Sequence, residues 1–139
     1  MTTILLTQPD EFAFTIGLIE SPCRLFPESI QNELSQYSGT DLVAWAEPKN
    51  RLFGIAQGKH SLCFRKKKVR ALVISHQLPA KGSGGVSLDA NLFGATRFVT
   101  LVKTDIFYED HLLWLRSNRK ALEQLFGLVI READSGYDC

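Results

Sequence analysis

The residues best suited to chemistry lie together in residues 69–93. The apolar run Ala71–Ile74 is too short for a helix and predicts a buried strand, after which the chain enters a glycine-rich loop. The loop contains Lys81, Gly82, Ser83, Gly84 and Gly85. Glycines let the backbone approach an anion closely, and a lysine adds positive charge beside it. We therefore predict a phosphate or pyrophosphate site in this loop, with an ordinary glycine-rich turn as the alternative.

The apolar spacing after the loop predicts a helix over residues 86–93. Val86 and Phe93 are seven residues apart, and Leu88 and Leu92 are four apart, which is typical of one helical face. A helix in this position would point the N–H groups of its first turn at the bound anion. The order strand, glycine loop and helix is therefore the predicted framework of the anion site.

Two further side chains are candidates for proton transfer. His76 directly follows the predicted strand, and a histidine titrates near neutral pH, which suits a general base. Glu47 ends the first strand of a predicted hairpin and is a second candidate base. The alternatives are a loop histidine bonded to the backbone and a solvated turn glutamate. Glu47 and Lys49 also match half of a metal-dependent nuclease motif, but no His, Cys, Asp and Glu set has the spacing of metal ligands, so we expect no metal.

A basic run, Arg65–Arg70, leads into the predicted strand. It could contact the phosphates of a nucleic acid, with Phe64 beside it to stack on a base, or it could be a solvated strand entrance. A third class of function, a partner-binding protein without catalysis, needs no motif. In that class Trp45, Trp114 and the tract Ile106–Tyr108 would form a contact patch, unless they belong to the core.

The composition limits the class of protein. The chain has 139 residues, 45% of them hydrophobic, and a net charge of +1. This length predicts one domain, residues 1–139, and the charge creates no global field toward nucleic acid or membranes. No apolar stretch is long enough to span a bilayer, and the N-terminus lacks the basic region of a signal peptide. The three cysteines match neither a disulfide framework nor a zinc pattern, so we expect a cytoplasmic protein with free thiols.

Strands and helices alternate along the chain. The clearest signal is a hairpin, with strands at 42–46 and 51–56 around a turn. A helix is predicted from Glu28, with Ile30 and Leu34 on its buried face, and another from Asp110 to Gly127. Further strands are predicted near residues 12–16, 98–102 and 128–130. This order predicts a single α/β domain in which a mixed β-sheet carries helices on both faces.

This order of elements resembles the GCN5-related N-acetyltransferase family over residues 40–130. In that family a hairpin is followed by a central strand, a pyrophosphate-binding loop with the pattern Gly-x-Gly, and a helix. Gly82, Ser83 and Gly84 match the Gly-x-Gly pattern. Asn118 and Ala121 match an Asn-x-x-Ala pattern that opens the helix before the final strands.

The resemblance implies an acyl-CoA N-acyltransferase-like fold with acetyl-CoA as cofactor. The pyrophosphate would lie on the N–H groups of residues 80–85, the pantetheine arm would pair with the backbone of Val73, Ile74 and Ser75, and Asn118 would complete the cofactor site. Two positions depart from the family. Pro79 replaces its usual Arg or Gln, and Leu125 replaces a tyrosine that often acts as general acid, for which Tyr108 is the nearest substitute.

We therefore predict acetyl-CoA-dependent acyl transfer to the amine of a small molecule or protein, with Glu47, His76 and Tyr108 as candidate catalytic residues. The first alternative is a non-enzymatic regulatory or partner-binding protein, such as an inactive relative of an enzyme or an immunity protein. Nucleic-acid binding is the second alternative. We expect no membrane partner. The sequence leaves the oligomeric state open, a homodimer included.

Overall fold

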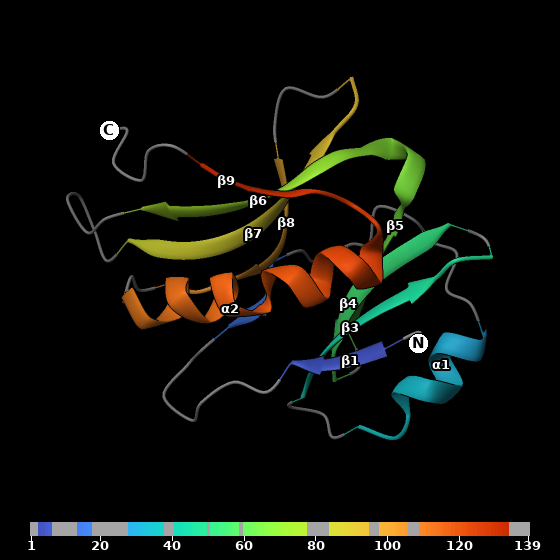
Figure 1. Ribbon diagram of the computed structural model, residues 1–139. Helices are drawn as coiled ribbons and strands as arrows, with labels where there is room; N and C mark the ends of the chain where they lie inside the picture. Colours follow the sequence, from blue (N-terminus) through green and yellow to red (C-terminus); the bar gives the residue numbers. More distant parts are fainter. Residues whose placement is uncertain are drawn as a thin grey trace.

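Two β-sheets and two α-helices make up the described part of the chain (Figure 1). The computed structural model describes residues 3–6, 14–17, 28–37, 41–49, 51–58, 60–77, 84–94, 98–105 and 109–133. Sheet A consists of β1 (Thr3–Leu6), β3 (Leu42–Glu47), β4 (Leu52–Gln57) and β5 (His60–Arg65). Sheet B consists of β2 (Thr15–Ile16), β6 (Val69–Gln77), β7 (Gly85–Leu92), β8 (Phe98–Lys103) and β9 (Ile130–Glu132). The helices are α1 (Glu28–Leu34) and α2 (Glu109–Phe126), and a short 3-10 turn, η1 (Lys66–Lys68), joins β5 to β6.

Sheet A is antiparallel, in the order β1-β3-β4-β5, and both of its faces are buried. The predicted hairpin is confirmed, because β3 and β4 pair with Ala44 opposite Ile55. These two side chains belong to the main core, whereas Trp45 packs on the opposite face in a second cluster with Ile30 of α1 and Cys63. Successive side chains of a strand point to opposite faces, so burial on both sides explains the unbroken apolar run in β3.

Sheet B has the order β2-β8-β7-β6-β9 and buries one face against the core. β6 is its longest strand and pairs with β7 antiparallel and with β9 parallel. Leu72, Ile74 and Leu88 point from β6 and β7 into the core, where they meet side chains from sheet A and α2. β6 therefore has a hydrogen-bonded strand on each side, as the predicted central strand requires.

The helix predicted over residues 86–93 is wrong, because β7 occupies this stretch. Val86, Leu88 and Ala90 are buried in the main core at every second position, which is the period of a strand. The four-residue spacing from Leu88 to Leu92 fits that period as well as the helical one, so apolar positions alone did not distinguish the two. Residues 86–93 therefore supply no helix N-terminus for the predicted anion site.

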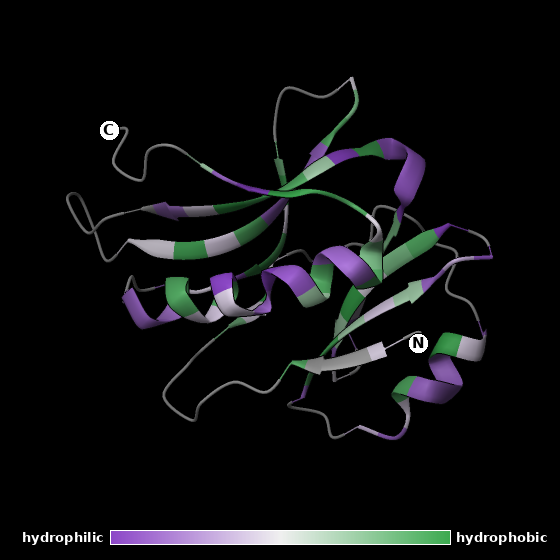
Figure 2. Ribbon diagram, in the orientation of Figure 1, coloured by the Kyte–Doolittle hydropathy of each residue, from purple (hydrophilic) through white to green (hydrophobic). Residues whose placement is uncertain are grey.

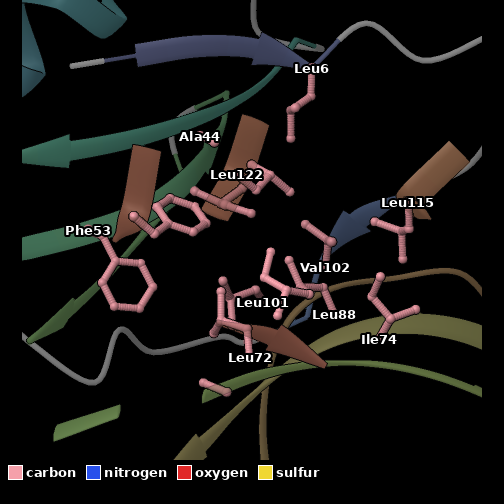
Figure 3. Close-up of a cluster of buried hydrophobic side chains, with 14 of the residues drawn as sticks. Leu6, Ala44, Phe53, Leu72, Ile74, Leu88, Leu101, Val102, Leu115 and Leu122 are labelled. Carbon is pink, nitrogen blue, oxygen red and sulfur yellow. The ribbon is translucent and has the colours of Figure 1, made fainter. Parts of the chain in front are cut away.

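The helix α2 contributes side chains to the core between the two sheets. Figure 2 shows that hydrophilic and hydrophobic residues alternate along this helix. Figure 3 shows Leu115 and Leu122 of α2 close to Leu6 of sheet A and Val102 of sheet B. The side chains that α2 buries are His111, Leu112, Leu115, Leu122 and Phe126. Because the helix contacts both sheets, it joins them into one core.

The boundaries predicted for the last helix agree with the structure. α2 begins at Glu109 and ends at Phe126, and Gly127 follows with a left-handed φ of 67°. This conformation suits a glycine that ends a helix, as predicted. The first predicted helix is confirmed as α1, in which Ile30 is fully buried.

The predicted fold class is confirmed in part. The described elements form one small domain of mixed α/β content, and sheet B contains both parallel and antiparallel pairs. The single sheet of the prediction is wrong, because the strands divide into a four-stranded and a five-stranded sheet. Strands also outnumber helices in the described residues. The likeness to the acyl-CoA N-acyltransferase fold stays a prediction.

The aromatic residues predicted to form contacts are mostly inside the molecule. Trp45 is fully buried, and Trp114 stacks on Phe14 with ring centroids 4.8 Å apart. Phe64 is only 1% exposed, so its predicted stacking on a nucleic-acid base is wrong. Residues 106–108 lie outside the described part of the chain. For the two tryptophans, the core interpretation is therefore the better one.

Two of the remaining sequence expectations can be compared with the structure. Cys63 is buried and forms no disulfide among the described residues, whereas Cys23 and Cys139 lie outside them. Among the helices that are described, none is long and apolar enough to cross a membrane.

Candidate functional site

A pocket of about 440 Å³ opens on the face of sheet B that points away from the core. Ser75 and His76 line it from β6, and Ser87 and Asp89 line it from β7. The other lining residues are Gly84, Gly85, Val86, Thr100, Lys103, Thr104 and Asp105. The pocket thus lies at the described end of the glycine loop, and polar side chains from neighbouring strands surround it.

The strand register explains why these polar side chains meet. Residues opposite one another on neighbouring strands point to the same face of a sheet. One row across β6, β7 and β8 contains Ser75, Ser87 and Lys103, and the next contains Val73, Asp89 and Thr100. Hydroxyl, carboxylate and ammonium groups from three strands therefore share one surface.

An irregularity between β7 and β8 brings Thr100 to Asp89. Leu88 pairs with Val102, but Asp89 pairs with Thr100, so Leu101 is an extra residue in β8. A bulge of this kind lets a strand change the direction of its side chains. Leu101 and Val102 are both buried in the core, and Thr100 still reaches the outer face.

Asp89 is the most buried acid of the pocket, with only 7% of its surface exposed. Its Oδ1 accepts a hydrogen bond from the Thr100 hydroxyl at 2.7 Å, and its Oδ2 accepts one from the Ser87 hydroxyl at 3.1 Å. No ion pair joins Asp89 to a cation in the described residues. Lys103, the cation that lines the pocket, pairs with Asp105 at 3.4 Å. A carboxylate has about four acceptor positions, so Asp89 can accept further hydrogen bonds from a bound group.

Close contact between β7 and β8 gives Gly85 a structural role. The Val86 N–H donates to the Thr104 hydroxyl at 3.1 Å, and the Thr104 N–H donates to the Val86 carbonyl at 2.8 Å. A Cβ atom on Gly85 would lie 2.7 Å from the Thr104 carbonyl oxygen, too close for any other residue. Gly84 has a left-handed φ of 71°. Strand packing and turn conformation therefore account for these two glycines without a bound phosphate.

Four of the predicted site residues come together at this pocket: Ser75, His76, Gly84 and Gly85. Val73 and Ile74 have a different environment. Ile74 points into the core, and β6 is flanked by β7 and β9 at both residues. The Ile74 carbonyl accepts a hydrogen bond from the Ala133 N–H at 2.9 Å. The backbone of Val73 and Ile74 is thus already paired within sheet B, which disagrees with the predicted pairing to a pantetheine arm.

The other predicted residues lie away from the pocket or outside the described residues. Glu47 lies on the hairpin of sheet A, where its carboxylate accepts from the Lys49 N–H at 3.1 Å. Asn118 lies in the middle of α2 instead of opening a helix, and its side chain donates to the Trp114 carbonyl at 2.9 Å. Tyr108, Lys81, Gly82 and Ser83 are outside the described residues. Neither Glu47 nor Asn118 is therefore placed to act together with His76.

A second charged group lies where β9 meets α2. The Arg116 guanidinium donates hydrogen bonds to Glu132, with Nε 2.9 Å from Oε1. These bonds, together with the positive charges of Arg116 and Arg119, hold the pKa of Glu132 below its usual value despite partial burial. The same hydrogen bonds raise the pKa of Arg116. The pair fastens β9 to α2, and no cluster of metal-binding residues occurs in the described segments.

The sequence interpretation missed Ser87, Asp89, Thr100 and Lys103. The signal for the first two was present, because Ser87 and Asp89 alternate with the apolar residues Val86, Leu88 and Ala90. Alternation of this kind is typical of a strand with one polar face. Thr100 could not be assigned in this way, because it reaches Asp89 only through the bulge at Leu101.

Comparison with known proteins identifies the family of the chain. The model of the family described as PM0294 C-terminal domain matches residues 21–135. No curated protein and no solved structure matches the chain. The matched region runs from before α1 through β9 and includes every residue that lines the sheet B pocket. It covers most of the chain, and the protein therefore belongs to the PM0294 C-terminal domain family.

Proposed function

We propose that the sheet B pocket binds a small molecule through an ammonium group, with Asp89 as its acceptor. The observation that carries this proposal is a buried carboxylate that faces a pocket and has two hydroxyl donors but no cationic partner among the described residues. Removing a carboxylate from water is costly unless the charge is paired. An ammonium group in the pocket would supply that charge.

The size and the lining of the pocket support a small ligand. A volume of about 440 Å³ is within the range of small-molecule sites. The hydroxyls of Ser75, Ser87 and Thr100 offer further hydrogen bonds around Asp89. Strands rather than long loops hold Ser75, Ser87, Asp89 and Thr100, so the acceptor groups keep their positions before the ligand arrives.

Acyl transfer to an amine is the reaction that we propose for such a ligand. The pocket would hold the amine acceptor, and His76, which also lines it, is the candidate base. Acetyl-CoA remains the proposed donor on the strength of the sequence resemblance alone. Because β7 replaces the expected helix, the binding of the amine and the binding of acetyl-CoA must be tested separately.

The test is a thermal-shift titration with a panel of primary amines, from ethylamine and ethanolamine to spermidine. A ligand at one hundred times its Kd should stabilise the folded protein by about 2.7 kcal/mol and raise the Tm by several degrees. Asp89→Asn keeps the shape but removes the charge, so we expect it to abolish the shift.

Asp105→Asn is the matched control, because the Asp105 side chain is 85% exposed at the same pocket. This variant should keep the amine-induced shift. An equal shift in the Asp89→Asn variant, or no shift with any amine, would contradict the proposal. A parallel titration with acetyl-CoA decides the donor: a saturable rise in Tm supports acyl transfer, whereas its absence with amine binding retained leaves a binding protein.

A further inference from the structure

The charges of this nearly neutral protein are strongly segregated along the sequence. Residues 48–88 contain nine Lys and Arg and no Asp or Glu, whereas the rest of the chain holds seven Lys and Arg and all fifteen Asp and Glu. The net charge of the whole chain is only +1, because the acidic residues outside residues 48–88 balance the basic residues within them. Local charge of one sign attracts ligands of the opposite sign even when the whole molecule is neutral.

The fold gathers part of this positive charge around η1. Lys67 and Lys68 are exposed in this turn, and Arg70 is exposed at the start of β6. The Lys66 N–H donates to the Arg51 carbonyl at 2.9 Å, which brings the turn of the sheet A hairpin beside η1. Figure 2 shows η1 as a hydrophilic segment at the junction of the two sheets. We call Arg51, Lys66, Lys67, Lys68 and Arg70 the basic strip.

One end of the basic strip borders a second pocket, of about 590 Å³. Arg51, Lys66 and Lys67 line this pocket, and no acidic residue is among its lining residues in the described chain. Its walls include Leu52 and Phe126. The pocket therefore combines positive charge with an apolar surface, which suits a ligand that carries both phosphate and a flat, poorly hydrated group.

The other end of the basic strip meets an exposed aromatic ring. Phe93 is 56% exposed, and its N–H donates to the Lys68 carbonyl at 3.0 Å. The Arg70 guanidinium lies 5.0 Å from the centre of the Phe93 ring. Phe98 is also half exposed, opposite Asn91 on the same hairpin. Exposed rings beside guanidinium and ammonium groups are typical of surfaces on which nucleic-acid bases stack.

We infer that the basic strip binds single-stranded nucleic acid, with phosphates on the lysines and arginines and a base on Phe93. Only an unpaired base offers its flat face to an aromatic side chain, which favours a single strand over a duplex. An acidic protein would satisfy the positive charges but would not require the exposed ring. The strip involves other residues than the sheet B pocket, so this inference does not depend on the proposed amine site.

The test is fluorescence anisotropy with labelled oligo(dT) and oligo(U) of about 20 nucleotides, repeated over a range of salt concentrations. Lys67→Ala/Lys68→Ala should reduce the slope of log K against log salt by about 1.4 and weaken binding about 25-fold at about 0.1 M salt. Phe93→Ala should weaken binding at least about fivefold and leave the salt slope unchanged.

Matched controls separate the strip from general effects of charge and exposed apolar surface. Lys120→Ala/Arg131→Ala removes two exposed cations elsewhere, and Leu113→Ala removes a side chain that is 48% exposed on α2. Both should bind like the unmodified protein, and the Tm of every variant reports whether it is folded. Absence of binding at low salt would overturn the inference. Equal binding of heparin and oligonucleotide, with no effect of Phe93→Ala, would also overturn it, because the strip would then be a general polyanion surface.

Discussion

Among the described residues, sheet A is covered on both faces, whereas sheet B is covered on one. In sheet A the main core lies on the side of Ala44 and Ile55, and the second cluster, which contains Ile30 of α1, lies on the side of Trp45. In sheet B the apolar residues of β6 and β7 face the core, and the opposite face holds Asp89 and its hydroxyl partners. Figure 1 shows α1 beside sheet A and away from the strands of sheet B.

Because their faces are covered differently, the two sheets have different roles in stability and in binding. A strand buried on both faces has no side chain available for a ligand, so sheet A contributes stability. A strand buried on one face needs apolar residues at only every second position, which leaves the others available for binding. Sheet B can therefore carry a polar pocket at little cost to the core. Substitutions on the outer faces of the two sheets should differ in effect.

The largest effect is expected from Gly54→Val in sheet A. A Cβ atom on Gly54 would overlap the Leu62 carbonyl oxygen and lie 2.8 Å from the Trp45 ring. The valine would have to separate β4 from β5 and displace the tryptophan, so we expect a loss of more than about 4 kcal/mol. Urea unfolding followed by circular dichroism measures this loss.

Gly94→Asn is the control for the general cost of replacing a glycine. Gly94 has a left-handed φ of 74°, but a Cβ atom there would meet nothing within 4 Å. Asparagine tolerates this conformation, so the expected cost is below about 1 kcal/mol. Similar losses for the two variants would mean that steric contact at Gly54 is not the cause.

Trp45→Ala and Ser87→Ala test the outer faces of the two sheets directly. Trp45 is fully buried against α1, so its truncation should cost about 3–5 kcal/mol. Ser87 donates one hydrogen bond to Asp89, and its loss should cost about 1 kcal/mol. Chemical denaturation of both variants gives the two values. A Ser87→Ala cost as large as that of Trp45→Ala would show that the outer face of sheet B is also structural.

The sequence predicted sheet A better than sheet B for a physical reason. The hairpin of β3 and β4 combines apolar runs with a turn of four residues, so the pairing is local and visible in the sequence. β6 and β9 are distant in the chain, and their parallel pairing depends on the position of α2 between them. Local signals cannot reveal such long-range pairing, and the division into two sheets was therefore missed.

The candidate site was predicted only where it coincides with local sequence signals. Gly84 and Gly85 were predicted from the loop, His76 from its position after the strand and Ser75 from the family resemblance, and all four line the pocket. Asp89 was assigned to a helix, because Leu88 and Leu92 fit two periods equally well. The burial of its carboxylate depends on neighbouring strands, which no pattern within residues 86–93 describes.

The smallest effect is expected at the edge of sheet B, where Arg116 and Glu132 join α2 to β9. Because the pKa of Glu132 is lowered in the folded protein, its charged form stabilises the fold above the ordinary glutamate value of about 4.5. This contribution is lost as the pH falls through the lower pKa of the folded state. The Arg116 side chain is 44% exposed, so water screens the pair and the contribution should not exceed about 1 kcal/mol.

Unfolding of the unmodified protein and of Glu132→Gln, measured from pH 7 to pH 3, tests this contribution. The difference in unfolding free energy should be constant near neutral pH and shrink progressively as the pH falls below about 4.5. Arg116→Gln should show the same pH dependence, and the double variant should lose no more than either single one. A difference that grows toward acid would mean that Glu132 destabilises the folded protein as an anion, which would contradict the prediction.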